Sequence, residues 1–197
     1  MWRKILLMVF GKRLDSQKLG EYEIGWWRAH NDRDKERMVK FLVEYNREFY
    51  SLSGDDSHAA VNCLAAAAKY HDTRDWGAAE RAAKEYYDLI LKYSDLGFDS
   101  KEVAKLEIGW WRIHDELEHN LDKTRLARAF ANLYAAEFRL DSGSLKRAGE
   151  LKAQATYEHD LAEDQMTAEE DREVHWKKAE ENLVEFYREL DRLLNKA

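Results

Sequence analysis

The sequence EIGWWRAH at residues 23–30 returns at residues 107–114 as EIGWWRIH, an offset of 84 residues. We refer to residues 23–30 as octet 1 and to residues 107–114 as octet 2. Tryptophan is a rare residue, so the return of two adjacent tryptophans inside a nearly identical octet indicates an internal duplication. Extending the sequence match on both sides of the octets predicts the fold.

The match continues on both sides of each octet. Upstream, LDS at 14–16 aligns with FDS at 98–100. Asp and Ser are favoured N-cap residues, so one helix is predicted to start near residue 16 and another near residue 100. Downstream, an aromatic stripe at 41–49 aligns with 130–138, a small-residue segment at 57–70 with 144–157, and an amphipathic segment at 76–90 with 176–190. Their helical periodicity predicts three further helices in each copy.

These matches predict an all-α protein of about eight helices, made by tandem duplication of a four-helix unit and packed with pseudo-two-fold symmetry. The units are predicted at residues 14–97 and 98–197, and residues 1–13 form a separate apolar N-terminal segment. Residues 65–90 also resemble a tetratricopeptide hairpin, with small residues before Tyr70 and alanines in the second helix. The repeat period and the absence of proline depart from that family, so no groove and no ligand are carried over from it.

The offset between the copies changes along the chain, and the changes predict where helices end. Copy 2 has five extra residues between octet and aromatic stripe, which on one continuous helix would rotate the stripe by about 140°. The octet and the aromatic stripe could not then both face the interior in the two copies, so a helix break is predicted near 31–36 and near 115–124. The aromatic stripes are predicted to stop at Ser53–Gly54 and Ser142–Gly143. Twelve extra residues near 161–172 are predicted to be a surface insertion.

The composition narrows the class of protein. The chain has 45% apolar residues, no proline and one cysteine, Cys63, which favours a helical globular protein without a disulfide framework and is consistent with a reducing cytoplasm. Its net charge is −7, and residues 148–197 hold fourteen acids against seven Lys plus Arg. Nucleic-acid binding is therefore not expected, because a phosphate-tracking surface needs a basic stripe.

The apolar run at residues 5–10 is too short for an export signal or for a membrane span, which needs about 20 apolar residues. We expect no membrane span, and we expect this run to pack onto the fold or onto a partner.

Each octet places an acid, an imidazole and two indoles on one face of its helix. With Glu23 at zero on a helical wheel, His30 falls about 20° to one side, Trp27 about 40° to the other and Trp26 about 60° away. Gly25 and Gly109 lie mid-helix, where glycine costs about 1 kcal/mol relative to alanine, so a close approach of another group is predicted there.

The first interpretation of the octets is structural. Buried indoles need an acceptor for their N–H, which Glu23 or Glu107 could supply, and Arg28 or Arg112 could pair with an acid of the other copy. The protein would then be a cytoplasmic helical binding or interaction module with no assignable catalysis. The octets would form the interface between the repeats, and a protein partner or self-association would be expected.

The alternative is a ligand-binding protein or an enzyme with a duplicated site. Indoles can stack on an aromatic small molecule, and a guanidinium can fix an anionic one. The candidate ligand-binding residues are Glu23, Trp26, Trp27, Arg28, His30, Glu107, Trp110, Trp111, Arg112 and His114.

Imidazoles together with carboxylates also suit zinc, iron or manganese. Both copies carry a second histidine followed by aspartate, at 71–72 and 159–160. The candidate metal ligands are Glu23, His30, His71, Glu107, His114 and His159.

Overall fold

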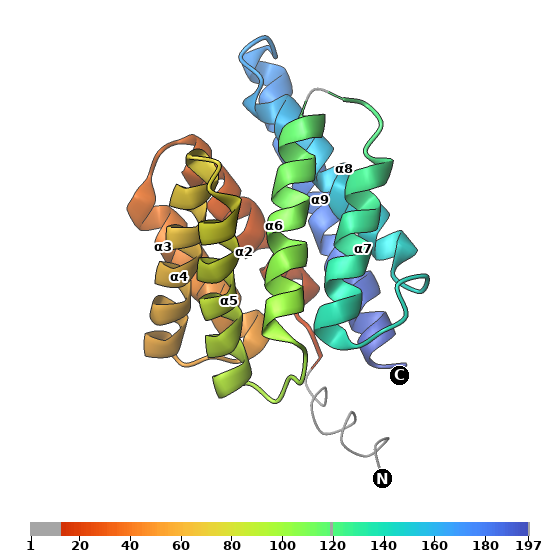
Figure 1. The fold of residues 1–197 in the computed structure, drawn as a ribbon. Coiled ribbons are helices and arrows are strands. Elements are labelled where there is room, and N and C mark those ends of the chain that lie inside the picture. The colour runs from red at the N-terminus through yellow and green to blue at the C-terminus, as the bar shows by residue number, and fades with distance from the viewer. Residues whose placement is uncertain (1–12, 119, 197) are drawn as a thin grey trace.

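The computed structural model describes residues 13–118 and 120–196, and this part of the chain forms eight α-helices and no strand (Figure 1). The helices are α2 (Ser16–Asn31), α3 (Lys35–Tyr50), α4 (Gly54–Asp72), α5 (Trp76–Tyr93), α6 (Ser100–Leu117), α7 (Thr124–Phe138), α8 (Lys146–Glu163) and α9 (Glu169–Leu194). The predicted all-α fold of about eight helices is confirmed. The predicted N-terminal segment lies almost wholly outside the described residues.

The helices that carry the octets begin and end where capping and offsets predict. Asp15 caps α2 by accepting a hydrogen bond from the Lys18 N–H, and Asp99 caps α6 in the same way. These bonds satisfy N–H groups that have no partner within the helix. The predicted breaks are also confirmed, because α2 ends at Asn31 and α6 ends at Leu117.

The predicted stop at Ser53–Gly54 is wrong. The α3 helix ends at Tyr50, and Ser51 takes the left-handed conformation that closes it. Ser53 instead caps α4 by accepting from the Asp56 N–H, and Gly54 is the first residue of α4. The short polar side chain therefore starts the next helix, and a residue other than glycine takes the left-handed turn.

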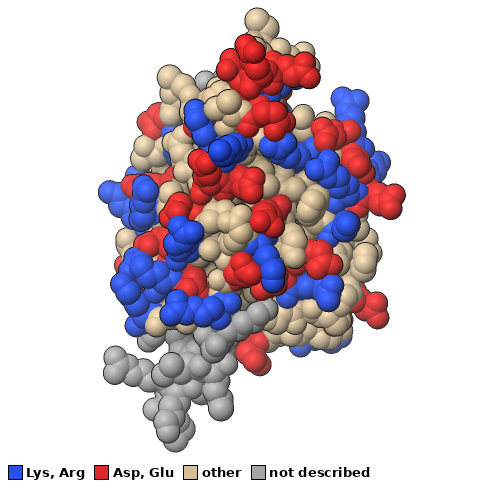
Figure 2. Space-filling model, turned by 180° about the vertical axis from the view of Figure 1, so that it is seen from behind, with Lys and Arg blue, Asp and Glu red and all other residues tan. Residues whose placement is uncertain are grey.

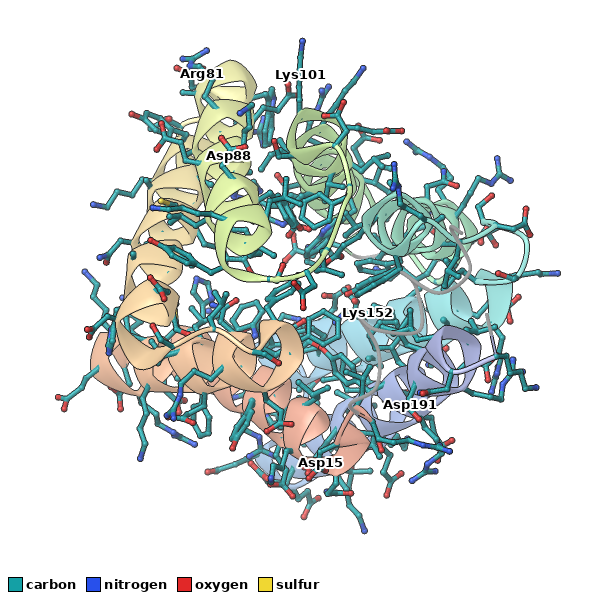
Figure 3. All side chains as sticks on the ribbon, turned by 90° about the horizontal axis from the view of Figure 1, so that it is seen from below. Asp15, Arg81, Asp88, Lys101, Lys152 and Asp191 are labelled. Carbon is teal, nitrogen blue, oxygen red and sulfur yellow. The ribbon has the colours of Figure 1, made fainter. Side chains whose placement is uncertain are left out.

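The eight helices close into a ring. Each helix packs against its neighbours in the chain, and α9 packs back against α2. Figure 3 looks along the helices and shows them around an interior filled with side chains, with Lys152 among those that point inward. In this order α2 lies opposite α6, and α3 lies opposite α7. The predicted repeat units, residues 14–97 and 98–197, are therefore neighbours in the ring at two places, at α9 with α2 and at α5 with α6.

Small residues let the helices approach closely. On α8 a Cβ added at Gly149 would lie 2.2 Å from the carbonyl oxygen of Ala127 on α7, so only glycine fits there. A Cβ at Gly25 would lie 2.7 Å from the ring of Phe41 on α3, whereas one at Gly109 would meet nothing within 4 Å. The predicted close approach is thus confirmed at Gly25 and wrong at Gly109, although both glycines stand at the same octet position.

The predicted insertion lies where α8 turns back into α9. Residues 161–172 form the last turn of α8, the connection and the first turn of α9, and this hairpin protrudes at one end of the molecule (Figure 1). Acidic side chains gather on the protruding tip in Figure 2, and Glu169, Glu170 and Asp171 there are exposed. Among the described residues, no helix has the length and apolarity that crossing a membrane requires.

Candidate functional site

The glutamates of the two octets lie in the ring interior. Glu23 accepts hydrogen bonds from Lys152 on α8 and, at 2.6 Å, from the Tyr187 hydroxyl on α9. Glu107 accepts from the Tyr87 hydroxyl at 3.0 Å and from the Trp111 indole at 3.0 Å. The predicted indole-to-glutamate bond is therefore confirmed for Glu107. These carboxylates link helices within the fold, so the structure does not bring them to the histidines as metal ligands.

The octet arginines lie against indoles of the helices that close each repeat. The Arg28 guanidinium lies 5.2 Å from the ring centroid of Trp176, and the Arg112 guanidinium lies 5.4 Å from that of Trp76. Arg28 also donates two hydrogen bonds of 3.1 Å from one nitrogen to Glu173. The predicted pairing of Arg28 with an acid of the other copy is confirmed, and this guanidinium is already engaged by a carboxylate.

Two histidines lie between pairs of indoles. The ring of His159 on α8 has centroid distances of 4.9 Å to Trp27 and 5.4 Å to Trp176. The ring of His71 on α4 has distances of 5.5 Å to Trp111 and 5.4 Å to Trp76. The residues of the two groups correspond in the sequence match, so these paired contacts are what a duplication would produce.

The other predicted residues lie at different places. Trp26 has its ring centroid 5.9 Å from that of Trp27, and Trp110 packs on Phe130 at 4.9 Å. Both indoles are partly buried and pack against the core. His30 is exposed at the end of α2.

Octet 2 brings its histidine to the second histidine of the same repeat. The Nε2 atom of His114 lies 2.8 Å from Oδ1 of Asp160, and the Nδ1 atom of His159 lies 3.4 Å from the same oxygen. One ligand atom from each of these three residues lies within 4.8 Å of the others. Among residues 13–118 and 120–196, no other group of three or more His, Cys, Asp or Glu side chains has ligand atoms this close together. We call these three residues the triad.

The triad is held by charged neighbours. The Nζ atom of Lys123, at the start of α7, lies 2.8 Å from Oδ2 of Asp160 and also donates to the backbone carbonyls of Leu117 and Glu118 at the end of α6. Glu163 has an oxygen 3.2 Å from Nε2 of His159. Lys123 therefore occupies one oxygen of the Asp160 carboxylate and leaves the other facing the histidines.

The pKa shifts in the triad favour an ionised Asp160 and a protonated His159. Burial by itself raises the pKa of Asp160, but hydrogen bonds from His114 and His159 outweigh it and hold that pKa well below its ordinary value. Burial lowers the pKa of His159, but hydrogen bonds to Asp160 and Glu163 outweigh it and raise that pKa to about 9. The Asp160 carboxylate thus lies between the protonated imidazole of His159 and the ammonium group of Lys123.

The first repeat carries the corresponding residues but does not assemble them. These are His30, His71 and Asp72, and the Asp72 side chain is 80% exposed. His71 turns instead to Asp115 on α6, at 3.1 Å. The residue that corresponds to Asp115 in the first repeat is Asn31. The amide of Asn31 cannot offer His159 the charge-assisted bond that Asp115 offers His71. His159 instead contacts Asp160 and Glu163 on its own helix, and His114.

The sequence prediction placed His114 and His159 among the candidate ligands but missed Asp160, Lys123 and Glu163. The repeated His-Asp pair was a signal for Asp160, since the aspartate recurs beside the histidine in both copies. Glu163 stands four residues after His159, a spacing that places both on one helix face. Nothing in the sequence around Lys123 marks it, because it reaches the triad from a loop.

No family model matches the chain, and it matches neither a curated protein nor a solved structure.

Proposed function

We propose that the protein binds one divalent transition-metal ion through Nε2 of His114, Nδ1 of His159 and Oδ1 of Asp160. The observation that carries this proposal is the convergence of the three ligand atoms within 4.8 Å, from two helices separated in the ring by α7. Two imidazoles and one carboxylate form a ligand set used by zinc, iron and manganese.

The spacing of the ligand atoms suits a metal ion. Ligands about 2.1 Å from a tetrahedral zinc lie roughly 3.4 Å apart. The nitrogen-to-oxygen distances in the triad are 2.8 and 3.4 Å, and the two imidazole nitrogens lie within 4.8 Å of each other, so the side chains would adjust to bring all three atoms to the ion. Metal binding must displace a proton from Nδ1 of His159, because the raised pKa of this imidazole keeps it protonated at neutral pH.

The neighbours of the triad also suit a metal ion. With Nδ1 on the metal, the Nε2–H of His159 can donate to Glu163, which is the carboxylate–histidine–metal arrangement common in metalloproteins. Lys123 holds Oδ2 of Asp160, so this carboxylate would bind through a single oxygen. Three protein ligands leave a position for water or a substrate, as in catalytic rather than structural zinc sites.

The test is a comparison of matched variants. Tag-free protein purified without chelators is analysed for bound metal, then titrated with Zn²⁺, Mn²⁺ and anaerobic Fe²⁺ by calorimetry. The wild type should bind one equivalent, and His114→Ala and Asp160→Asn should each weaken binding at least tenfold. His30→Ala and Asp72→Asn, which change the corresponding residues of the first repeat, should bind like the wild type.

Circular dichroism of every variant separates loss of a ligand from loss of the fold. Wild type that binds no stoichiometric metal, or equal losses in the two pairs of variants, would contradict the proposal.

A second candidate is the interaction module predicted from the octets. Its specific support is two exposed apolar side chains in the loops that follow α6 and α8, Leu121 at 80% and Met166 at 90% exposure. Size-exclusion chromatography with light scattering would detect self-association, which Met166→Ser should then abolish.

We also propose that the protein works in a reducing cytoplasm. The support is that the sequence has a single cysteine, Cys63, and so no disulfide framework.

A further inference from the structure

The centre of the ring holds more acidic than basic groups. Three carboxyl side chains point into it from three helices: Glu23 on α2, Glu107 on α6 and Glu137 on α7. One ammonium group, that of Lys152 on α8, lies among them and pairs with Glu23. The other buried lysine, Lys123, lies at the triad. Among the described residues, the ammonium group of Lys152 therefore faces three carboxyl groups, and its charge acts on Glu107 and Glu137 as well as on Glu23.

The remaining polar groups of the interior carry no positive charge. Hydroxyl groups reach the centre from α3, α5, α7 and α9, and burial raises the pKa of each tyrosine well above its ordinary value, so they stay neutral. They belong to Tyr45, Tyr50, Tyr86, Tyr87, Tyr134 and Tyr187. Asn46 on α3 accepts from the Tyr86 hydroxyl at 2.8 Å. Neutral donors can stabilise a carboxylate, but they do not cancel its charge.

Of the two carboxyl groups that do not bond Lys152 directly, Glu137 is the more deeply buried, because its exposure is 2% whereas Glu107 keeps partial exposure. Burial raises the pKa of Glu137 to about 8, and the nearby Glu107 adds to that rise, whereas the hydrogen bond from Tyr50 and the charge of Lys152 oppose it. An ionised carboxylate that shares its cation with two other carboxyl groups is costly in such a place, because the interior does not solvate it as water does.

Glu137 also joins two helices that lie opposite each other in the ring. The Tyr50 hydroxyl on α3 donates to Glu137 on α7 at 2.6 Å. Beside this bond the rings of Phe49 and Phe138 meet with centroids 5.7 Å apart. The charge of the Glu137 side chain therefore affects the contact between α3 and α7 across the ring.

We propose that the ring is a proton-operated latch: Glu137 holds a proton while the ring is closed, and the loss of that proton as pH rises favours a state in which α7 has moved away from α3. Water reaching the carboxylate in the open state replaces the solvation that the closed interior withholds. The latch depends on the interior alone, so it stands or falls independently of metal binding at the triad.

The test is nuclear magnetic resonance on full-length protein labelled with ¹³C at glutamate carboxyl carbons. One resonance should titrate near pH 8, and it should be missing from Glu137→Gln, whose amide oxygen can still accept the Tyr50 hydrogen bond. Amide protection factors in α7 should fall by up to about tenfold per pH unit between pH 5.5 and 7.5. The fall should be smaller in Glu137→Gln. Glu48→Gln changes the corresponding residue of the first repeat and should behave as the wild type.

Two outcomes would overturn the latch. One is a wild-type spectrum in which every glutamate carboxyl titrates below pH 6, which needs no variant to be folded. The other is a fall of α7 protection with pH that is the same in Glu137→Gln as in the wild type.

Discussion

The imidazole of His159 lies against the indole of Trp27, with ring centroids 4.9 Å apart at an angle of 66°. Trp27 belongs to octet 1, whereas the neighbour of His159 in the triad, His114, belongs to octet 2. The helices that carry the octets, α2 and α6, are not neighbours in the ring. They meet through a histidine that neither contains.

Trp27→Ala should weaken metal binding as well as the fold. Removing a buried indole costs about 3–5 kcal/mol, and His159 would lose the wall that fixes its ring. Calorimetry with Zn²⁺ and denaturant unfolding measure the two effects. Trp111→Ala, which removes the corresponding wall of His71, should lower stability and leave zinc affinity unchanged. Equal zinc affinity in wild type and Trp27→Ala would contradict the assigned role of the indole.

Glu163→Gln should lower metal affinity by about 10- to 100-fold, because an amide oxygen is a weaker acceptor for the second N–H of His159 than a carboxylate. Competition with a chromogenic zinc chelator gives the affinity. The control is Glu158→Gln on the same helix, where the carboxylate lies 2.7 Å from His175 and away from the triad. If both variants lose affinity equally, the effect comes from net charge rather than from the bond to His159.

The Lys152–Glu23 pair predicts strong coupling between two substitutions. Lys152→Met leaves a buried carboxylate without its cation and should cost about 3–5 kcal/mol of unfolding free energy. The double variant Glu23→Gln with Lys152→Met should recover part of that loss, because it buries neither charge. Denaturant unfolding of the four proteins measures the coupling energy. Additive losses would show that the two side chains do not depend on each other.

The double variant Glu23→Gln with Glu107→Gln separates the interior from the triad. Both carboxylates accept hydrogen bonds from helices of the ring, so their replacement should lower the melting temperature. The metal content should stay at one equivalent, because neither side chain is in the triad. Elemental analysis of the folded variant checks this. Loss of metal without unfolding would indicate that these glutamates are metal ligands.

Glu137 gives the unfolding free energy a negative dependence on pH. Its pKa is raised to about 8 in the folded chain from an ordinary value near 4.5, so the folded state binds more protons between these values. Its contribution is fully present below about pH 4.5 and is lost as pH rises to about 8, with a slope of up to about 1.4 kcal/mol per pH unit. Urea unfolding from pH 5 to 9 should show a flatter profile for Glu137→Gln than for the wild type.

The two octet glycines should respond oppositely to alanine. A Cβ at Gly25 meets the Phe41 ring at 2.7 Å, so Gly25→Ala forces that ring to move and should destabilise the fold. A Cβ at Gly109 meets nothing within 4 Å, so Gly109→Ala should stabilise the fold by up to about 1 kcal/mol through helix propensity. Thermal melts of both variants decide this, and a shift of the same sign in both would contradict the assigned contact.

Local sequence signals determined the helical class of the chain and the limits of α2 and α6, but not the end of α3, which lies at Tyr50. Caps such as Asp15 and Asp99 act within a few residues, and helical periodicity shows which face is apolar. The internal match added the breaks after Asn31 and Leu117, since an altered offset is incompatible with one continuous amphipathic helix. These features need no knowledge of distant neighbours, which is why the sequence alone supplies them.

Only the tertiary structure decided how the helices meet. Packing of α6, α7 and α8 brought Asp160 to His114 and Lys123 to Asp160, and closure of the ring placed Glu23 and Glu107 in its interior. Positions that correspond in the sequence match came to differ. Phe41 lies against Gly25 but nothing lies against Gly109, and Asp115 bonds His71 whereas the residue corresponding to Asp115 is Asn31. The physical reason is that side-chain convergence depends on neighbours far away in the chain. A repeated octet determines which residues share one face of its helix, but it does not determine which residues that face contacts in the fold.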